Sequence, residues 1–240
     1  IKLRQMNKEK NSLEKISNYY LKKQTNIDKK LVQFRYDTIK KYFKGNNCLE
    51  IGTAEGLMTQ NLLDNFKKVT VVEASKKLLS EVNDHKRLIK INSLVENFKT
   101  REKYKTIILD HVLEHVKYPN KTLKKIYNLL DKNGIFIVGV PNADSFHRLI
   151  AVEMGILKRK NSLNVTDHKL GHRRVYTPFE LKKTLIKNGF KIKKFEGIFL
   201  KTLSNKQIDN FFNENTINGF FKVGKRFPYN CADICYVCQK

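Results

Sequence analysis

The feature that most constrains the fold is a regular alternation between short β-branched segments and longer segments with helical spacing. Strand character begins at Cys48, and the first strand runs into Gly52 and a loop. Further strands are expected at residues 69–73, 88–91, 106–110, 135–140, 190–200 and 232–239, with helices at 57–65, 75–84, 120–130 and 177–188. Strands and helices that alternate at this spacing predict a doubly wound, Rossmann-like α/β sheet.

This pattern divides the chain into four expected parts. Residues 1–45 form a Lys-rich helical lid segment, residues 46–145 the ligand-binding core, residues 146–176 a cap insertion that breaks the alternation, and residues 177–240 the completion of the sheet. The last part opens with Thr177-Pro178-Phe179-Glu180, which supplies an N-cap, a proline at the first helical position and a capping box.

The formal net charge of +25 raises the question of nucleic-acid binding. Only nine of the 48 basic residues are arginines, and the lysines are scattered along the whole chain. Arginine is the side chain that best grips phosphate and base edges. We therefore attribute the charge to solvent-exposed lysines and a biased amino-acid composition, and we do not expect a nucleic acid as partner.

No run of residues is apolar over the ~18 positions that a membrane span needs, and the first ten residues, IKLRQMNKEK, contain no apolar leader. Membrane association is therefore not expected. Cys231, Cys235 and Cys238 have a spacing that could hold an iron–sulfur cluster. The apolar, β-prone stretch around them instead favours a buried last strand in which cysteine packs as a small hydrophobe. Reduced thiols predict a cytoplasmic protein.

The loop after the first strand indicates the kind of ligand. Gly52 permits a tight turn off the strand, and Gly56 permits a helix to start close to a ligand. A dinucleotide fingerprint requires glycine where this chain has Ala54 and Leu57, so that interpretation fits poorly. Glu50 precedes the first glycine by two residues, and a carboxylate there suits a cation such as the sulfonium and ammonium of S-adenosylmethionine.

Polar residues at the ends of the next strands complete a nucleoside site. Glu73 lies 21 residues after Gly52, where a carboxylate accepts hydrogen bonds from ribose hydroxyls. The run Asn92-Ser93-Leu94 is placed to contact the adenine, and Asp110 ends the fourth strand at the edge where ligands of open α/β sheets bind.

The segments 49–56 (LEIGTAEG), 71–75, 109–123 and 134–142 together resemble the class I S-adenosylmethionine-dependent methyltransferases. The run 171–190 resembles the branch that acts on small molecules, including sugars of bacterial surface polysaccharides. The resemblance implies a seven-stranded sheet whose last strand is antiparallel, S-adenosylmethionine as cofactor, and cofactor contacts that include Thr53, Ala74 and Tyr20. Ala54 departs from the family pattern, which usually has glycine there.

Histidines near the expected crevice are candidates for a general base, since the imidazole pKa lies close to working pH. His111 and His115 follow the fourth strand, and in the resembling family the Leu-Glu-His of this motif lies at the mouth of the site. A purely structural role is equally plausible for His115. The set Asp110, His111, Glu114 and His115 also contains metal-ligating side chains, but the family motif explains their adjacency, and we expect no metal.

The acceptor is expected to meet His147, His172, Arg173 and Tyr176, because a histidine beside arginines suits an anionic substrate. The sequence therefore predicts O-methylation of a small anionic or sugar-like metabolite, for example in surface polysaccharide biosynthesis. Two alternatives stay open at this point: an RNA methyltransferase, and a non-catalytic binding protein on the same fold.

Overall fold

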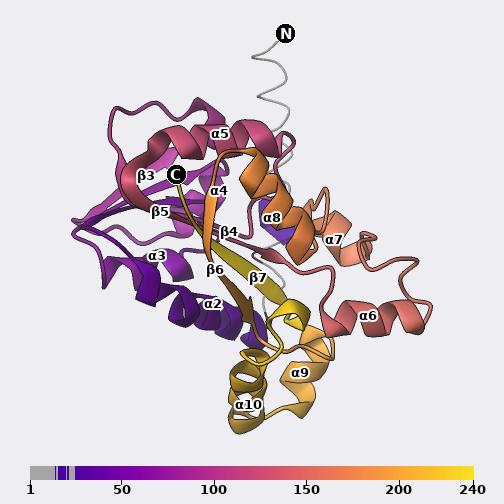
Figure 1. Ribbon diagram of the computed structural model, residues 1–240. Helices are drawn as coiled ribbons and strands as arrows, with labels where there is room; N and C mark the ends of the chain where they lie inside the picture. Colours follow the sequence, from indigo (N-terminus) through magenta and orange to yellow (C-terminus); the bar gives the residue numbers. More distant parts are fainter. Residues whose placement is uncertain (1–13, 15, 20, 22–24) are drawn as a thin grey trace.

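Seven strands form one sheet in the computed structural model, which describes residues 14, 16–19, 21 and 25–240 (Figure 1). The strand order is β3-β2-β1-β4-β5-β7-β6, and only β7 runs antiparallel to its neighbours. The strands are β1 Asn47–Ile51, β2 Lys68–Glu73, β3 Leu88–Asn92, β4 Tyr104–Asp110, β5 Leu130–Pro141, β6 Lys191–Ile198 and β7 Asp233–Gln239. The expected fold class is confirmed, including the antiparallel last strand.

Helices cover both faces of the sheet, as a doubly wound fold requires. The helices that cover the two faces are α2 Asn26–Ile39, α3 Leu57–Leu63, α5 Pro119–Leu129 and α8 Pro178–Lys187. Apolar residues of α2 and α3 share one core cluster with the sheet, whereas those of α5 and α8 share the other. A short helix, α4 Lys76–Glu81, follows β2.

The three clustered cysteines are free and buried on or beside β7. Cys235 belongs to the core cluster on the α2 face, and Cys238 belongs to the cluster on the α5 face. Side chains three positions apart on a strand point to opposite faces of the sheet. Because the sheet separates the two thiols, they pack as small hydrophobes and are not arranged as ligands of one cluster.

Between the core elements lie four helices that the sequence pattern did not resolve. The 146–176 region contains α6 Phe146–Glu153 and α7 Val165–Leu170, while α9 Asn205–Phe211 and α10 Glu214–Gly224 connect β6 to β7. Three short 3-10 turns occupy Lys40–Tyr42, Val95–Asn97 and Pro228–Asn230. The start of β5 also differs from expectation, because the strand begins at Leu130 instead of residue 135.

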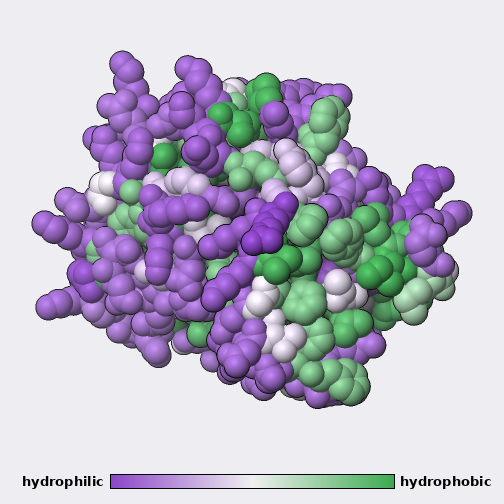
Figure 2. Space-filling model, turned by 60° about the horizontal axis from the view of Figure 1, so that its bottom comes forward, coloured by the Kyte–Doolittle hydropathy of each residue, from purple (hydrophilic) through white to green (hydrophobic). Residues whose placement is uncertain are grey.

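Hydrophobic side chains gather on the face that carries α9 and α10, at the bottom of Figure 1, and Figure 2 shows this face directly. Phe211, Phe227 and Tyr229 are among the exposed large hydrophobic residues. Within the described part of the chain, no helix combines the length and apolar character needed to cross a bilayer.

Candidate active site

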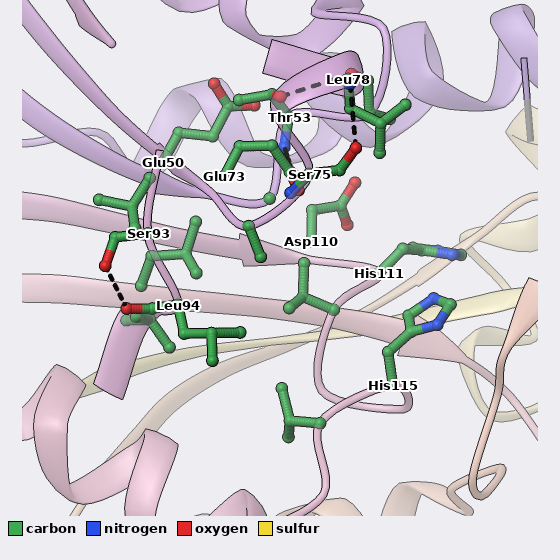
Figure 3. Close-up of a pocket in the computed structure, with 18 of the residues that line it drawn as sticks. Glu50, Thr53, Glu73, Ser75, Leu78, Ser93, Leu94, Asp110, His111 and His115 are labelled. Carbon is green, nitrogen blue, oxygen red and sulfur yellow. Dashed lines mark hydrogen bonds between the residues drawn. The ribbon is translucent and has the colours of Figure 1, made fainter. Parts of the chain in front are cut away.

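A cavity of about 820 Å³ opens at the carboxyl ends of β1, β2 and β4. This is the edge where parallel α/β sheets bind ligands. Most of the residues predicted to bind a cofactor line the cavity, namely Glu50, Gly52, Thr53, Glu73, Ala74, Ser93, Leu94 and Asp110. Figure 3 shows the carboxylates of Glu50, Glu73 and Asp110 on one side and the rings of His111 and His115 on the other.

The glycine loop between β1 and α3 owes its shape to positive φ angles. Gly52 has a φ of +78°, and a Cβ there would lie 2.3 Å from Cγ2 of Val112. Gly56 has a φ of +85° and caps α3, but it lies outside the cavity lining. Ala54 adopts a φ of 45°, a left-handed conformation that costs a non-glycine residue free energy. A side chain at Gly52 would therefore clash with Val112 and strain the backbone, whether or not a ligand is bound.

Two buried carboxylates are fixed by hydrogen bonds from their own neighbourhood. Glu73 accepts from the backbone amide of Thr53 at 3.0 Å and from that of Ser75 at 2.7 Å. Burial raises the pKa of Glu73, although these amides oppose the rise. Glu50 accepts the hydroxyl of Thr59 at 2.6 Å, and burial raises the pKa of Glu50 to about 8.

Two of the three predicted adenine contacts line the cavity, and the third lies outside the lining and makes hydrogen bonds to the backbone. Ser93 and Leu94 line the cavity, and the Ser93 hydroxyl donates to the Leu94 carbonyl at 2.9 Å (Figure 3). Asn92 instead donates to the carbonyls of Glu73 and Ala74, so it braces the end of β2. Tyr20 lies outside the described residues. From the same N-terminal segment, Ile16 and Ser17 line the cavity.

His111 connects the cavity to a chain of buried ions. Its Nε2 lies 3.3 Å from Oδ2 of Asp233 on β7, and its Nδ1 lies 3.6 Å from Oε1 of Glu114. Arg35 of α2 donates to Asp110 at 2.7 Å and to Asp233 at 3.0 Å. Burial lowers the pKa of His111, but the Asp233 carboxylate raises it, and the net pKa lies above the ordinary value. His111 itself has a φ of 54°, a strained conformation of the kind that clusters at functional sites.

His115 also lines the cavity, with its ring packed edge-on against that of His172 at a centroid distance of 4.7 Å. Burial, together with the neighbouring His172 and His111, lowers the pKa of His115 to about 3. Its imidazole is therefore neutral at physiological pH.

Among the residues predicted to bind the acceptor, only Arg173 lines the cavity. Its backbone amide donates to the Glu114 carbonyl at 2.9 Å, and its Nε donates to the His115 carbonyl at 2.8 Å. His172 is held by Asp167. His147 is half-buried and Tyr176 is buried, and both lie outside the cavity lining. The cap insertion thus meets the site through Arg173 and Leu170.

Sequence reasoning missed two kinds of site residue. Arg35 and Asp233 come from elements nearly 200 positions apart, so no local motif announces their contact. Lys117, Lys121 and Lys125 also line the cavity. Lys121 and Lys125 are four positions apart on α5, which puts them on one face and was readable from the sequence, whereas Lys117 precedes the helix.

Comparison with known proteins gives the arrangement a context. A family model described as a methyltransferase domain matches residues 23–194. The chain is 27% identical over 195 residues to the ubiquinone biosynthesis O-methyltransferase of Pelagibacter ubique, and the match covers 79% of this chain and 80% of that protein.

Solved structures share the fold at low identity. A SAM-dependent methyltransferase from Archaeoglobus fulgidus has a TM-score of 0.60 and 19% identity, and the match covers 88% of this chain and 94% of the other. The N-methyltransferase NodS from Bradyrhizobium japonicum, in complex with S-adenosyl-L-homocysteine, has a TM-score of 0.55 and 12% identity over 88% and 85% of the two chains.

Proposed function

This chain belongs to the family of class I S-adenosylmethionine-dependent methyltransferases, and from that premise we propose that it methylates a hydroxyl of a small anionic or sugar-like acceptor. The observation that carries the proposal is the division of charge in the cavity. The carboxyl groups of Glu50, Glu73 and Asp110 gather at one end, and the rings of His111 and His115 lie at the other (Figure 3). Arg173 belongs to the histidine end, because its Nε donates to the His115 carbonyl.

The carboxylate end fits the cofactor. S-adenosylmethionine supplies an electrophilic methyl group on a sulfonium centre that also needs a negative environment. Glu73 is fixed by two backbone amides at the end of β2 and keeps lone pairs for the ribose hydroxyls. Glu50 and Asp110 place further carboxyl groups along the same wall. The raised pKa keeps a proton on Glu50 in the free chain, but a bound cation stabilises the carboxylate and favours loss of that proton, so this wall suits a cationic ligand better than a phosphate.

The other end fits an acceptor that has to lose a proton. The acceptor oxygen must lie about 3 Å from the methyl carbon, on the side opposite sulfur and away from water. We assign His111 as the base, with Asp233 stabilising its protonated ring from 3.3 Å. Arg173 supplies positive charge for an anionic acceptor.

Two further observations support the finer parts of the proposal. The similarity to an O-methyltransferase favours oxygen as the acceptor atom, and the 171–190 run favours a sugar, as in surface polysaccharide biosynthesis. Free, buried cysteines are consistent with a reducing compartment such as the cytoplasm.

Thermal unfolding with S-adenosylhomocysteine, beside NAD as control, tests the donor half. A ligand at about 100 times its dissociation constant stabilises the folded state by about 2.7 kcal/mol, so we expect a rise of several degrees with S-adenosylhomocysteine alone. A rise with NAD alone, or with neither ligand, would contradict the cofactor assignment.

The His111→Ala variant tests the acceptor half. We expect its affinity for S-adenosylhomocysteine to match that of the native chain, while kcat falls by about 100-fold or more, the typical contribution of a general base. His168→Ala, which removes an exposed histidine on α7, is the matched control. An unchanged kcat for His111→Ala would remove this residue from the mechanism.

A further inference from the structure

Three side chains of types that bind metal ions meet beside the histidine end of the cavity, which we call the acceptor end because we propose that the acceptor binds there. Glu114 and His115 follow β4, and His172 comes from the end of the cap insertion. One ligand atom from each residue lies within 4.8 Å of the others. His115 also lines the cavity, so the cluster is open to small solutes from that side.

Glu114 is the unusual member of this group. Its side chain is fully buried, and within the described residues neither of its carboxylate oxygens has a hydrogen-bond partner. Nδ1 of His111 lies 3.6 Å from Oε1 of Glu114, which is beyond hydrogen-bond distance. Native proteins rarely leave a buried carboxylate unsatisfied, because desolvation without compensation is costly. A bound cation is one of the few partners that would compensate both oxygens.

His172 is oriented as a ligand by a second carboxylate. Its Nδ1 lies 3.0 Å from Oδ1 of Asp167, and Asp167 is itself paired with Arg148 at 3.3 Å. This leaves Nε2 of His172 for the cluster. A carboxylate behind a histidine fixes the tautomer and the ring orientation of histidines that bind metals.

We propose that Glu114, His115 and His172 bind one divalent transition-metal ion of the Zn²⁺ or Co²⁺ type. Two imidazoles and one carboxylate favour these ions over Mg²⁺ and Ca²⁺, which prefer oxygen ligands. Ligand atoms ~2.1 Å from a tetrahedral ion lie about 3.4 Å apart, so the side chains need to close by little more than 1 Å. A fourth position would face the cavity beside His115.

The sequence alone did not point to this site. The metal-ligating set considered from the sequence came from one segment, residues 110–115. The third ligand of the cluster, His172, lies 57 positions after His115 and reaches it only through the fold. The proposal goes beyond methyl transfer and does not depend on the identity of the acceptor.

Titration of the metal-free, untagged chain with Co²⁺ tests the proposal directly. The buried thiols of β7 should not compete for the ion, so we expect one Co²⁺ to bind per chain and to give visible ligand-field absorption. One equivalent of Zn²⁺ should displace the Co²⁺ and abolish this absorption. Mg²⁺ in large excess should leave the absorption unchanged. Absence of any absorption change, or displacement of Co²⁺ by Mg²⁺, would overturn the proposal.

Variants locate the ion. Glu114→Gln and His172→Asn should each weaken Co²⁺ binding by about 10- to 100-fold, and Zn²⁺ should no longer raise their unfolding temperature as it does for the native chain. His168→Asn changes an exposed histidine four positions from His172 and should bind as the native chain does. Glu114→Gln keeps the proposal falsifiable if His172→Asn fails to fold. Native-like Co²⁺ affinity in a folded Glu114→Gln protein would overturn the assignment, whatever the outcome with S-adenosylhomocysteine.

Discussion

The two ends of the cavity are built in different ways: the donor end, where we propose that Glu50 and Glu73 bind the cofactor, and the acceptor end with His111, His115 and Arg173. At the donor end, Glu73 and Glu50 are fixed by groups no more than 20 positions away: Glu73 by the amides of Thr53 and Ser75, and Glu50 by the hydroxyl of Thr59. Asp110 is the exception, because Arg35 holds it across 75 positions. At the acceptor end, the fixing contacts join segments almost 60 residues apart, as when Arg173 donates to the His115 carbonyl. The donor end is therefore a local motif, and the acceptor end is a tertiary assembly of charged side chains.

This difference predicts separate sensitivities. A change in the ion pairs of the cap insertion should affect stability and leave the donor end able to bind. At the donor end, a change at Glu73 should affect ligand binding, and changes at Glu50 and Ala54 should alter stability by less than the loss expected in the cap insertion.

The largest expected effect comes from Arg148→Met in the cap insertion. Arg148 is buried, pairs with Asp167, and donates to the carbonyls of Lys160 and Ser162. Removing one partner of a buried pair costs about 3–5 kcal/mol, because the other charge is left uncompensated. Urea unfolding should show this loss, while affinity for S-adenosylhomocysteine measured under folding conditions stays within twofold of the native value.

Arg159→Met is the control, since Arg159 is exposed in the same segment and should cost little. If Arg148→Met lowers cofactor affinity as strongly as it lowers stability, the two ends are one unit and the contrast between them is wrong.

Glu50→Gln should change the pH dependence of stability. Because the pKa of Glu50 is about 8 in the folded chain and near 4.5 unfolded, the folded chain holds one more proton between these values, and stability falls as pH rises through that window. This contribution of Glu50 lowers the free energy of unfolding by about 2–3 kcal/mol between pH 6 and pH 8. The glutamine side chain cannot ionise, so the variant should lack this contribution. Unfolding curves at pH 6, 7 and 8 measure the difference, and parallel profiles for the two proteins would contradict it.

Glu73→Gln should weaken binding of S-adenosylhomocysteine by about 10- to 100-fold, or about 1.4–2.7 kcal/mol. An amide keeps one acceptor oxygen, but its NH₂ group would face a backbone N–H of Thr53 or Ser75. Calorimetric titration measures the loss. Glu102→Gln, outside the cavity lining, serves for comparison, and equal affinities for the two variants would remove Glu73 from the cofactor site.

The smallest expected effect is a gain from Ala54→Gly. Glycine adopts the left-handed conformation of position 54 at no steric cost, although it loses more entropy on folding. The net stabilisation should be about 0.5–1 kcal/mol, which corresponds to a rise of about 1–4 °C in unfolding temperature. A fall in unfolding temperature would show that the Ala54 methyl group has a packing role that outweighs its strain.

The donor end was predictable because its signals are short-range. A strand, a glycine loop and a carboxylate at the end of the next strand specify Glu50, Gly52 and Glu73 within 24 residues. The acceptor end depends on which segments the fold brings together. Arg35 meets Asp233 across 198 positions, and His172 meets His115 only because the cap insertion folds back over the end of β4.

Some of what the pattern missed was nevertheless visible. Ser204 and Gln207 form a capping box at the start of α9, and Asn164 and Asp167 form another at α7. Each is the N-cap and N3 pair that marks a helix start, but the helices are only seven and six residues long, and periodicity cannot show a helix so short.

The position of β7 between β5 and β6 has a consequence for how the chain is made. On the ribosome, β6 is synthesised before the strand that joins it to the sheet, so β5 and β6 both wait with open edges until residues 233–239 emerge. The same segment delivers Asp233 to Arg35, a residue of α2. Until residues 233–239 emerge, a nascent chain therefore lacks Asp233, the carboxylate that lies beside His111, although the residues of the donor loop have already been synthesised.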